Sequence, residues 1–530
     1  MAFVLNDDLV HEIFRTCSIH SLLNLSLVST RFHAASVPHL VRDVSLAQSP
    51  EQVLCFLRYI IDNTQLPDAV ALGERSDASG ISGPGKHVIS FEIRRSAFDS
   101  TVEGTYNHIR IEPEPRPVES WASTLTKALA LMPNLCSFAM FGSGNTKRIF
   151  SHSPDFAMTL MSRLFLEELS LSGLNDAVST AIGQAMQSRN LKGGTKFKKL
   201  CFYRNITTGD PPVSLVRTNG IGSLISHCRD SLEVLELTDP TIQSFLYSPG
   251  EAASSDGITS VEAGTMIFPN VVRFAWYFTL DISLDSLNSS FPSLKNLDLG
   301  YYTPPRPDHE ILFKNLKSVG GTYNDVSSFL QFIALPDKIR RLDLRSLPTL
   351  DADHHLGISR VASGLKSLHV ENSGRDETDW WKFFHPSFSS LTYLSVSFVD
   401  MFTEYIGTMA SILLVNENLP PLLASVPLEY MSILIIGHPI WGQRPSDFEA
   451  FTMTEDEVAM RYAKHVKTLK FVDVYKSWAV DPDCDEHWHY WRIIREDSPD
   501  DGGKGVQLEA LDAADGKAWN KWYDDAAFRE

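Results

Sequence analysis

The side chains best placed to bind a metal ion lie close together near the C-terminal end of the chain. Cys484, His487 and His489 occur within six positions, in the stretch DPDCDEHWHYW. Thiolate and imidazole groups at such spacing are ligands that zinc prefers, but a structural zinc site needs four of them. No second group of this kind follows, and the neighbouring Trp488 and Trp491 favour packing instead. We therefore expect neither a metal ion nor any other cofactor.

Motifs that perform catalysis are missing from the sequence. It contains no phosphate-cradling G-x-x-x-x-G-K-[ST] loop, no G-x-G-x-x-G fingerprint and no G-x-S-x-G nucleophile elbow. His354 and His355 are adjacent, so their side chains point apart in regular structure. The 65 carboxylates include no pair that spacing singles out for acid/base work. The sequence thus favours a protein that binds over one that catalyses.

The composition is that of a folded, acidic protein. Of its 530 residues, 43% are hydrophobic, and the net charge of −18 disfavours a nucleic acid partner because phosphate backbones are also negative. The six cysteines show no paired spacing, which is typical of a reducing compartment. We find no secretory signal and no window of about 20 apolar residues that could span a bilayer. We expect a soluble protein of the cytoplasm, the nucleus or both, without membrane contact.

Three short helices are predicted within the first 40 residues. Apolar residues recur at helical spacing from Leu9 to Phe14 and from Leu22 to Val28, and a third stretch precedes Pro38. A module of this size buries little apolar surface and is barely stable by itself. We therefore expect it to complete its core against a partner.

The segment VLNDDLVHEIFRTCSIHSLLNLSLVSTRFHAASVPHLVRDVSL resembles the F-box family, although Asn6 replaces the usual proline and Ser29 the usual cysteine. The resemblance implies that these helices bind the Skp-type adaptor of a cullin-RING ubiquitin ligase. The residues that match the family pattern, and that the resemblance assigns to adaptor binding, are Leu5, Leu9, Ile13, Phe14, Leu22, Leu25, Leu27, Val28, Arg31 and Phe32.

A six-residue pattern returns along the body of the chain: apolar, two residues, apolar, one residue, apolar. Clear copies are LEELSL at Leu166, LEVLEL at Leu232 and LKSLHV at Leu365; twelve copies lie between residues 88 and 476, with a weaker one, LKSVGG, at Leu316. Such recurrence is the signature of a stacked solenoid, in which each unit adds one strand to a continuous core.

These units resemble leucine-rich repeats, although the asparagine that usually follows the strand is absent. The resemblance implies an α/β fold: a short three-helix F-box, then an irregular leucine-rich-repeat solenoid whose curved parallel sheet carries helices and loops on its convex side. An unrelated α/β fold with repeated buried strands is the alternative. We predict an F-box at residues 1–47, a connecting helix and flexible loop at 48–87, a leucine-rich-repeat-like domain at 88–476, and an acidic, Trp-rich cap or tail at 477–530.

The polar positions of each strand motif alternate with the buried ones and therefore face the concave side of the sheet. They are rich in Arg and Tyr, which are enriched in protein-binding surfaces; a solvated face without a ligand is the alternative. We predict that a protein substrate binds there, at Tyr203, Glu236, Arg273, Tyr277, Asp298, Arg341, Asp343, Arg345, His369, Glu371 and Tyr393.

These patterns predict a substrate-recognition adaptor and not an enzyme. The N-terminal helices would bind the Skp-type adaptor, and through it the cullin-RING ligase, while the repeat domain would hold an unidentified protein substrate. Tethering would raise the local concentration of the ubiquitin-charged partner enzyme at the substrate. Two alternatives stay open: a repeat scaffold that delivers nothing for degradation, and an enzyme with a repeat-like sheet.

Overall fold

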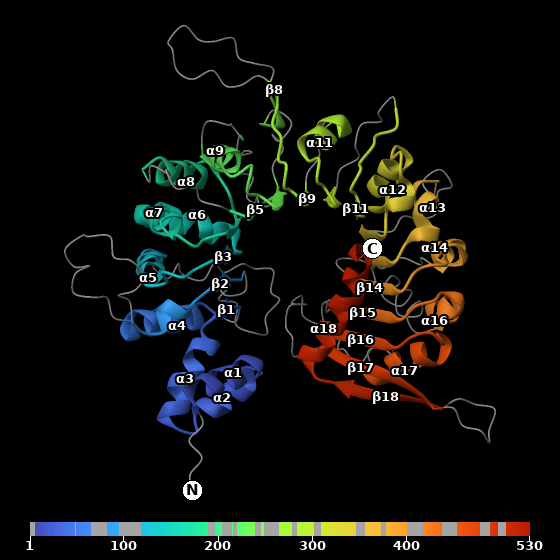
Figure 1. Ribbon diagram of the computed structural model, residues 1–530, viewed down its shortest axis with the longest axis horizontal. Coiled ribbons are helices and arrows are strands. Elements are labelled where there is room, and N and C mark those ends of the chain that lie inside the picture. Colours follow the sequence, from blue (N-terminus) through green and yellow to red (C-terminus); the bar gives the residue numbers. More distant parts are fainter. Residues whose placement is uncertain are drawn as a thin grey trace, which may run out of the picture. The chain divides into compact units, whose positions relative to one another are not determined.

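The structure is a computed structural model, and its described part forms two compact units of alternating strands and helices, Met1–Val271 (unit 1) and Val272–Glu530 (unit 2) (Figure 1). The described residues are 6–17, 19–47, 49–64, 82–94, 118–188, 197–203, 215, 220–238, 245–248, 264–277, 283–300, 309–345, 356–372, 378–399, 417–436, 453–477, 488–496 and 505–529. No helix among these residues is long and apolar enough to cross a membrane.

Unit 1 begins with the three predicted helices. The first and third start at N-cap residues, Asn6 and Ser29, whose side chains accept hydrogen bonds from backbone amides that the helix itself leaves unpaired. Val10, Phe14 and Leu22 form a small buried core between the helices. The helices are α1 (Asp7–Thr16), α2 (Ile19–Ser26) and α3 (Thr30–Leu40).

The rest of unit 1 is a parallel sheet whose strands follow chain order, with helices on one face (Figure 1). The strands pair in register, so that Phe91, Phe138 and Leu169 are neighbours and are completely buried. The strands are β1 (Asp43–Leu46), β2 (Ser90–Ile93), β3 (Ser137–Met140), β4 (Glu168–Ser172), β5 (Lys199–Tyr203) and β6 (Val234–Leu237). The helices are α4 (Pro50–Asn63), η3 (Pro84–His87), α5 (Val118–Ala130), α6 (Ser143–His152), α7 (Pro154–Met161), α8 (Asp176–Ser188) and α9 (Gly220–His227).

The sheet of unit 1 starts directly after the three N-terminal helices. β1 pairs with β2 along its whole length, so a strand at residues 43–46 opens the sheet, ahead of the first copy of the six-residue pattern at residue 88. The predicted connecting helix is α4, while residues 65–81 of the predicted flexible loop lie outside the described part of the chain. A separate two-stranded ribbon is formed by β7 (Tyr247–Ser248) and β8 (Gly264–Thr265).

Unit 2 continues the same design and then changes it at its end. Its strands are parallel and follow chain order up to β16, after which β17 and β18 extend the sheet in the antiparallel sense. The strands are β9 (Arg273–Trp276), β10 (Asn296–Asp298), β11 (Ser318–Thr322), β12 (Arg341–Arg345), β13 (Ser367–Asn372), β14 (Tyr393–Val399), β15 (Tyr430–Ile436), β16 (Phe471–Ser477), β17 (Trp488–Glu496) and β18 (Gly505–Leu511).

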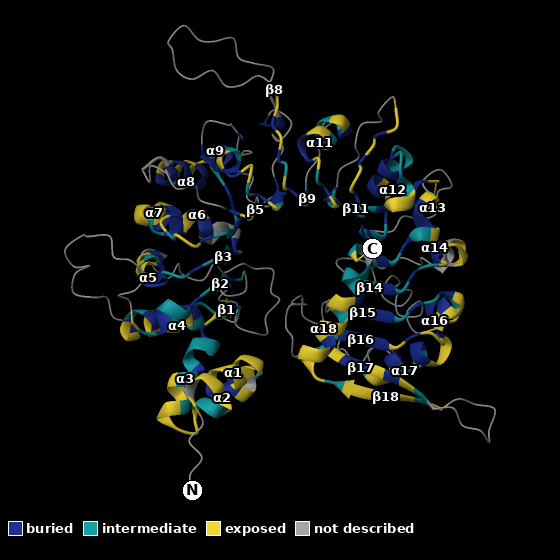
Figure 2. Cartoon of the chain, in the orientation of Figure 1, coloured by how far each residue is buried: buried dark blue, intermediate teal, exposed yellow. Residues whose placement is uncertain are grey.

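The helices of unit 2 divide between the two faces of its sheet. Most pack on one face, and α18 lies against the other (Figure 1). The strands up to β16 and the sheet-facing sides of the helices are the most buried parts, whereas β18 is largely exposed (Figure 2). The helices are α11 (Leu284–Ser290), α12 (Tyr323–Gln331), η6 (Pro336–Lys338), α13 (Leu356–Val361), η8 (Ala362–Gly364), α14 (Thr378–Phe384), η9 (His385–Ser387), α16 (Leu419–Leu422), η11 (Leu423–Ser425), α17 (Glu455–His465), α18 (Ala513–Asp524) and η15 (Asp525–Phe528).

The strand prediction is confirmed throughout the repeated region. All twelve strong motifs and the weaker LKSVGG copy form strands, which are β2 to β6 and β9 to β16. The predicted fold class, N-terminal helices followed by repeated parallel strands with helices, is therefore confirmed. β17 and β18 were not predicted; they lie in the acidic, Trp-rich region.

Two leucines of adjacent elements test how much the inner strand positions contribute to stability. Leu368 in β13 is completely buried, whereas Leu356 at the start of α13 is 64% exposed. We expect Leu368→Ala to lower the free energy of unfolding by about 2–5 kcal/mol, because it leaves a cavity in the sheet core. Leu356→Ala should change it by no more than about 0.5 kcal/mol. Urea denaturation monitored by tryptophan fluorescence measures both; equal losses would contradict the assigned core.

Candidate protein-binding sites

The N-terminal helices expose an unusual amount of apolar surface. Six large apolar side chains of this small module are more than two-fifths exposed, and α1 and α2 are largely coloured as exposed in Figure 2. Exposed apolar groups gathered on one module are typical of a protein-binding surface. They are Leu9 (49% exposed), Ile13 (43%), Ile19 (64%), Leu23 (48%), Leu27 (84%) and Val28 (66%), here called the apolar helical surface.

The structure divides the predicted adaptor-binding residues into two groups. Leu9, Ile13, Leu27 and Val28 are exposed, as is Arg31. Phe14 and Leu22 need correction, because they are buried inside the module. Leu25 and Phe32 pack against this core and are partly exposed. Leu5 lies outside the described residues, and the sequence prediction missed Ile19 and Leu23.

The second candidate site is the face of the unit 2 sheet opposite most of its helices. In-register pairing places side chains of equal position side by side along two rows. One row is Arg341, Ser367, Tyr393, Tyr430 and Phe471, and the next is Asp343, His369, Ser395, Ser432 and Asp473. This surface, here called the strand face, is where the sequence predicts substrate binding.

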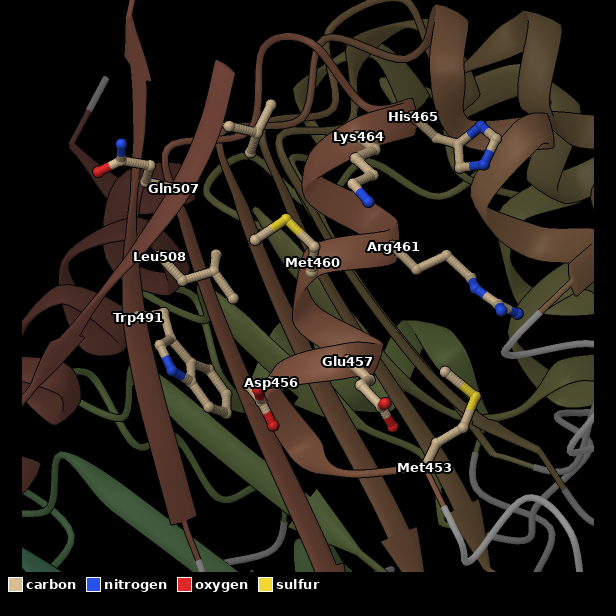
Figure 3. A pocket seen from close by; sticks show the side chains of 11 residues that line it. Met453, Asp456, Glu457, Met460, Arg461, Lys464, His465, Trp491, Gln507 and Leu508 are labelled. Atoms are coloured by element: carbon tan, nitrogen blue, oxygen red, sulfur yellow. The ribbon is translucent and has the colours of Figure 1, made fainter.

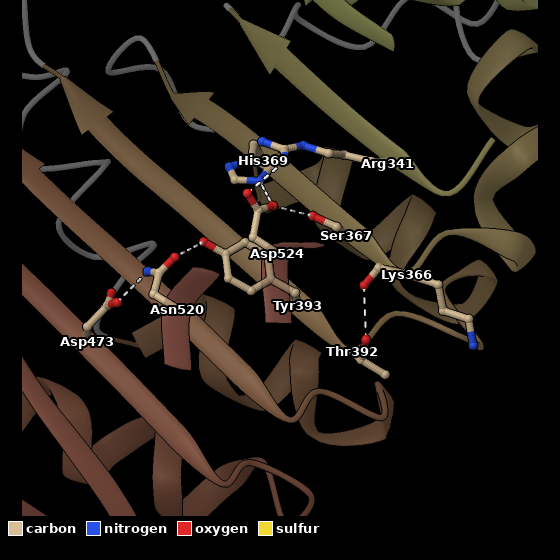
Figure 4. A network of polar contacts seen from close by, with 9 residues as sticks. All are labelled: Arg341, Lys366, Ser367, His369, Thr392, Tyr393, Asp473, Asn520 and Asp524. Atoms are coloured by element: carbon tan, nitrogen blue, oxygen red, sulfur yellow. Dashed lines mark hydrogen bonds and ion pairs between the residues drawn. The ribbon is translucent and has the colours of Figure 1, made fainter. Parts of the chain in front are cut away.

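A helix of the same chain occupies much of the strand face. The Asp524 carboxylate of α18 lies 2.7 Å from Arg341 Nη1 and 2.7 Å from His369 Nε2, and it accepts a hydrogen bond of 3.1 Å from the Ser367 hydroxyl (Figure 4). Burial alone would raise the pKa of Asp524, but the hydrogen bond and charge of His369, together with Arg341, outweigh it and hold that pKa below its ordinary value.

One turn earlier, α18 makes a second set of polar contacts. Asn520 accepts a hydrogen bond from the Tyr393 hydroxyl at 3.1 Å and donates one to Asp473 at 2.6 Å (Figure 4). Asp473 also accepts the Tyr430 hydroxyl at 2.7 Å, and its Oδ1 has no hydrogen-bond partner among the described residues. Burial raises the pKa of Asp473 to about 6.

Aromatic rings complete the contact between α18 and the strand face. Tyr393, Tyr430 and Phe471 stack along their row with ring centroids 5.6 and 6.1 Å apart. Tyr523 packs into this cluster, and Trp519 stacks on Phe471 at 4.7 Å. Aromatic pairs at these distances add to the stabilisation that burial alone provides.

The predicted substrate residues therefore have several different surroundings. In unit 2, Arg341, His369 and Tyr393 lie on the predicted side of the sheet, where they contact α18. Their role in substrate binding stays a prediction. In unit 1, the Tyr203 hydroxyl donates a hydrogen bond to Glu236, which is itself buried.

The other predicted residues of unit 2 lie around two features. Arg345 forms an ion pair with Asp298 and lies over the Tyr277 ring, and burial raises the pKa of the nearby Glu371. Arg273 and Asp343, with Asp298, line a cavity of about 90 Å³ that Phe528 also borders. This cavity is the part of the strand face beside the end of the C-terminal helix.

A larger groove of about 1010 Å³ lies between α17 and the antiparallel strands β17 and β18 (Figure 3). Met460, Trp491 and Leu508 form apolar parts of its wall, while charged residues of both signs lie along α17. The acidic Asp456 and Glu457 lie in the first turn of α17, and Lys464 and His465 lie in its last turn, so the groove carries opposite charges at its two ends.

The structure describes only one of the three residues considered for metal binding. Cys484 and His487 lie outside the described residues, and His489 is on β17. Within the described part of the chain, no three His, Cys, Asp or Glu side chains are grouped so that they could hold a metal ion.

Comparison with known proteins identifies the N-terminal module. Residues 3–37 match the F-box domain family, so the chain carries an F-box domain formed by α1, α2 and most of α3. The chain is also similar to a chain in the crystal structure of the Rad7 and Elc1 complex in yeast, with a TM-score of 0.35 and 12% identity over 83% of this chain and 94% of that one. A comparison with curated proteins gives no match.

Asp473 should make the stability of unit 2 depend on pH. Its pKa rises from 3.8 to about 6 on folding, so the folded state binds a proton that the unfolded state releases between these values. The free energy of unfolding should therefore fall by up to about 3 kcal/mol as pH rises from about 4 to above 6. Asp473→Asn removes the charge and keeps an oxygen for Tyr430 and Asn520, so this pH dependence should disappear. Denaturant titrations from pH 4 to 8 measure it, with the exposed Asp515→Asn as control; an unchanged profile in Asp473→Asn would refute the assignment.

Gly516 should be required where α18 crosses β17. A Cβ atom at this buried glycine would lie 2.1 Å from Cγ of Tyr490, whereas one at Gly505 would meet nothing within 4 Å. We expect Gly516→Ala to destabilise the protein by about 1–3 kcal/mol through overpacking, although alanine is the better helix former. Gly505→Ala should have an effect within about 0.5 kcal/mol. Urea denaturation compares the two, and a harmless Gly516→Ala would mean that α18 does not pack this closely.

Proposed function

We propose that this chain is the substrate-recognition adaptor of a Skp/cullin/F-box ubiquitin ligase. The observation that carries the proposal is the apolar helical surface of the F-box domain. Val10, Phe14 and Leu22 already provide the internal core of this domain, so the exposed leucines and isoleucines are not needed to hold it together. They are available to a second protein.

The energetics favour a stable contact at this surface. Burying a leucine or isoleucine side chain contributes about 1.5–3 kcal/mol relative to leaving it exposed. Six partly exposed side chains, covered together, can therefore supply much of the binding energy of a specific complex. A Skp-type adaptor with a complementary apolar surface is the partner we propose, and through it a cullin-RING ligase.

The repeat body is the proposed substrate receptor. Its parallel strands, each offering alternate residues to a common core, support an irregular leucine-rich-repeat solenoid that starts with β1 and ends in the region of residues 477–530. The body would bind a protein substrate on the strand face and hold it where a ubiquitin-charged partner enzyme can reach it. Catalysis would come from proximity, with no nucleophile supplied by this chain, in the cytoplasm or nucleus.

Adaptor binding is tested by a double substitution on α1. Leu9→Asp with Ile13→Asp places two charges on the apolar helical surface, where each would be buried unpaired in the complex. We expect co-purification of a Skp-type adaptor with the full-length chain to be lost. Because both side chains are exposed, the fold should survive, as judged by circular dichroism and thermal denaturation.

The matched control lies on the same helix. Glu12 and Arg15 form an exposed ion pair with each other, and surface pairs of this kind contribute little to stability. Glu12→Ala with Arg15→Ala should keep adaptor binding. Retained binding by the Leu9→Asp, Ile13→Asp chain would overturn the proposed function.

A further inference from the structure

The residues of α18 that meet the strand face form one helical stripe. Gly516, Trp519, Asn520, Tyr523 and Asp524 are spaced three or four residues apart along the chain and therefore lie on one side of the helix. Each has a defined contact with the sheet of unit 2. A short sequence pattern in α18 therefore makes the contacts with the strand face.

The contact has the chemistry of a protein–protein interface and not of a domain core. Of the α18 residues whose side chains are described, only Gly516 and Tyr523 are buried, and Trp522 is 54% exposed on the outer side. The sheet itself already has its core on the other face, where Leu342, Leu368 and Leu394 are completely buried. Tyrosine, tryptophan and charged hydrogen bonds around a small apolar centre are typical of contacts between separate surfaces.

The surface under α18 is built for a ligand with an aromatic ring and an acid. Three stacked rings, Tyr393, Tyr430 and Phe471, form its apolar part. Beside them, Arg341, Ser367 and His369 all aim hydrogen-bond donors at one carboxylate, that of Asp524 (Figure 4). An occupant that covers Arg341 must supply an acceptor there, because an arginine that is largely removed from water without a partner is unfavourable.

We propose that α18 is an exchangeable internal ligand of the strand face, and that the same surface binds a helix of another protein that carries the pattern aromatic, amide, two residues, aromatic, acid. The helix is joined to the body through β18, the outermost strand of the sheet, so its release would break no strand pairing. Only the identification of the competing helix as a ubiquitination substrate rests on the proposed function.

Exchange requires that α18 detach while the sheet stays folded. Hydrogen exchange monitored by mass spectrometry on the unmodified full-length chain measures this directly. We expect amides of α18 to exchange at least 100-fold faster than those of β13 to β15, because they open locally and the strands open only on global unfolding. Equal protection in the helix and these strands would overturn the proposal.

Binding in trans is measured with a fluorescent peptide that has the sequence of residues 512–529. Full-length Tyr523→Ala, Asp524→Ala weakens the internal ligand and leaves the strand face intact, so it should bind the peptide at least 10-fold more tightly than the unmodified chain. A peptide with the same two substitutions should bind at least 10-fold more weakly. Full-length Trp522→Ala, which removes an exposed ring of the same helix, should behave like the unmodified chain.

Three outcomes would overturn the proposal. The opened chain could bind the native peptide no better than the unmodified chain, or bind the native and substituted peptides alike. It could also dimerise in light scattering, in which case the occupant in trans is a second copy. If the double variant fails to fold, Gly516→Ala opens the helix by a clash with Tyr490 and keeps every contacting side chain for the same titration. No arm of the experiment contains the ligase adaptor, so failure here is distinct from failure of the proposed function.

Discussion

In-register pairing of the parallel strands is the constraint on which both faces of each sheet depend. Side chains alternate across a strand, so a shift of one residue would turn every inner leucine outward. With the register fixed, Leu342, Leu368 and Leu394 form a continuous buried row, and the positions beside them form the strand face. The stacked rings of Tyr393 and Tyr430 and the shared carboxylate of Asp524 follow from that same alignment.

The repeated pattern explains why the strands were predictable. Each motif places apolar residues at the first, fourth and sixth positions, and this combination persists even where helices and loops between the motifs vary in length. β17 and β18 escaped prediction because they pair in the antiparallel sense and β18 is largely exposed, which leaves them without the motif. Their position after β16 covers an edge that the repeat would otherwise leave open.

The candidate sites were only partly predictable, for a physical reason in each case. In the F-box domain, apolar residues occur on both sides of short helices, so periodicity alone does not separate the internal Phe14 and Leu22 from the exposed Ile19 and Leu23. On the strand face, a polar side chain such as Arg341 is compatible both with exposure to water and with an ion pair to an acid of the same chain, so the sequence does not tell these two states apart. A helix at α18 could have been predicted from the N-cap Asp512 and from the helical spacing of Gly516, Asn520, Tyr523 and Asp524. The acidic composition of the region favoured a tail instead.

The two candidate sites differ in what binding requires of the protein. The apolar helical surface is already exposed, so a partner can bind it without rearrangement. The strand face is occupied by α18. A ligand there can bind only the molecules in which the helix has left, so its apparent affinity is the intrinsic affinity multiplied by that fraction. Because Asp473 lies beneath Asn520 and Asp524 accepts from Arg341 and His369, that fraction depends on charges buried in the contact. Under the proposed exchange, recognition at the strand face is conditional, whereas the apolar helical surface is accessible without any rearrangement.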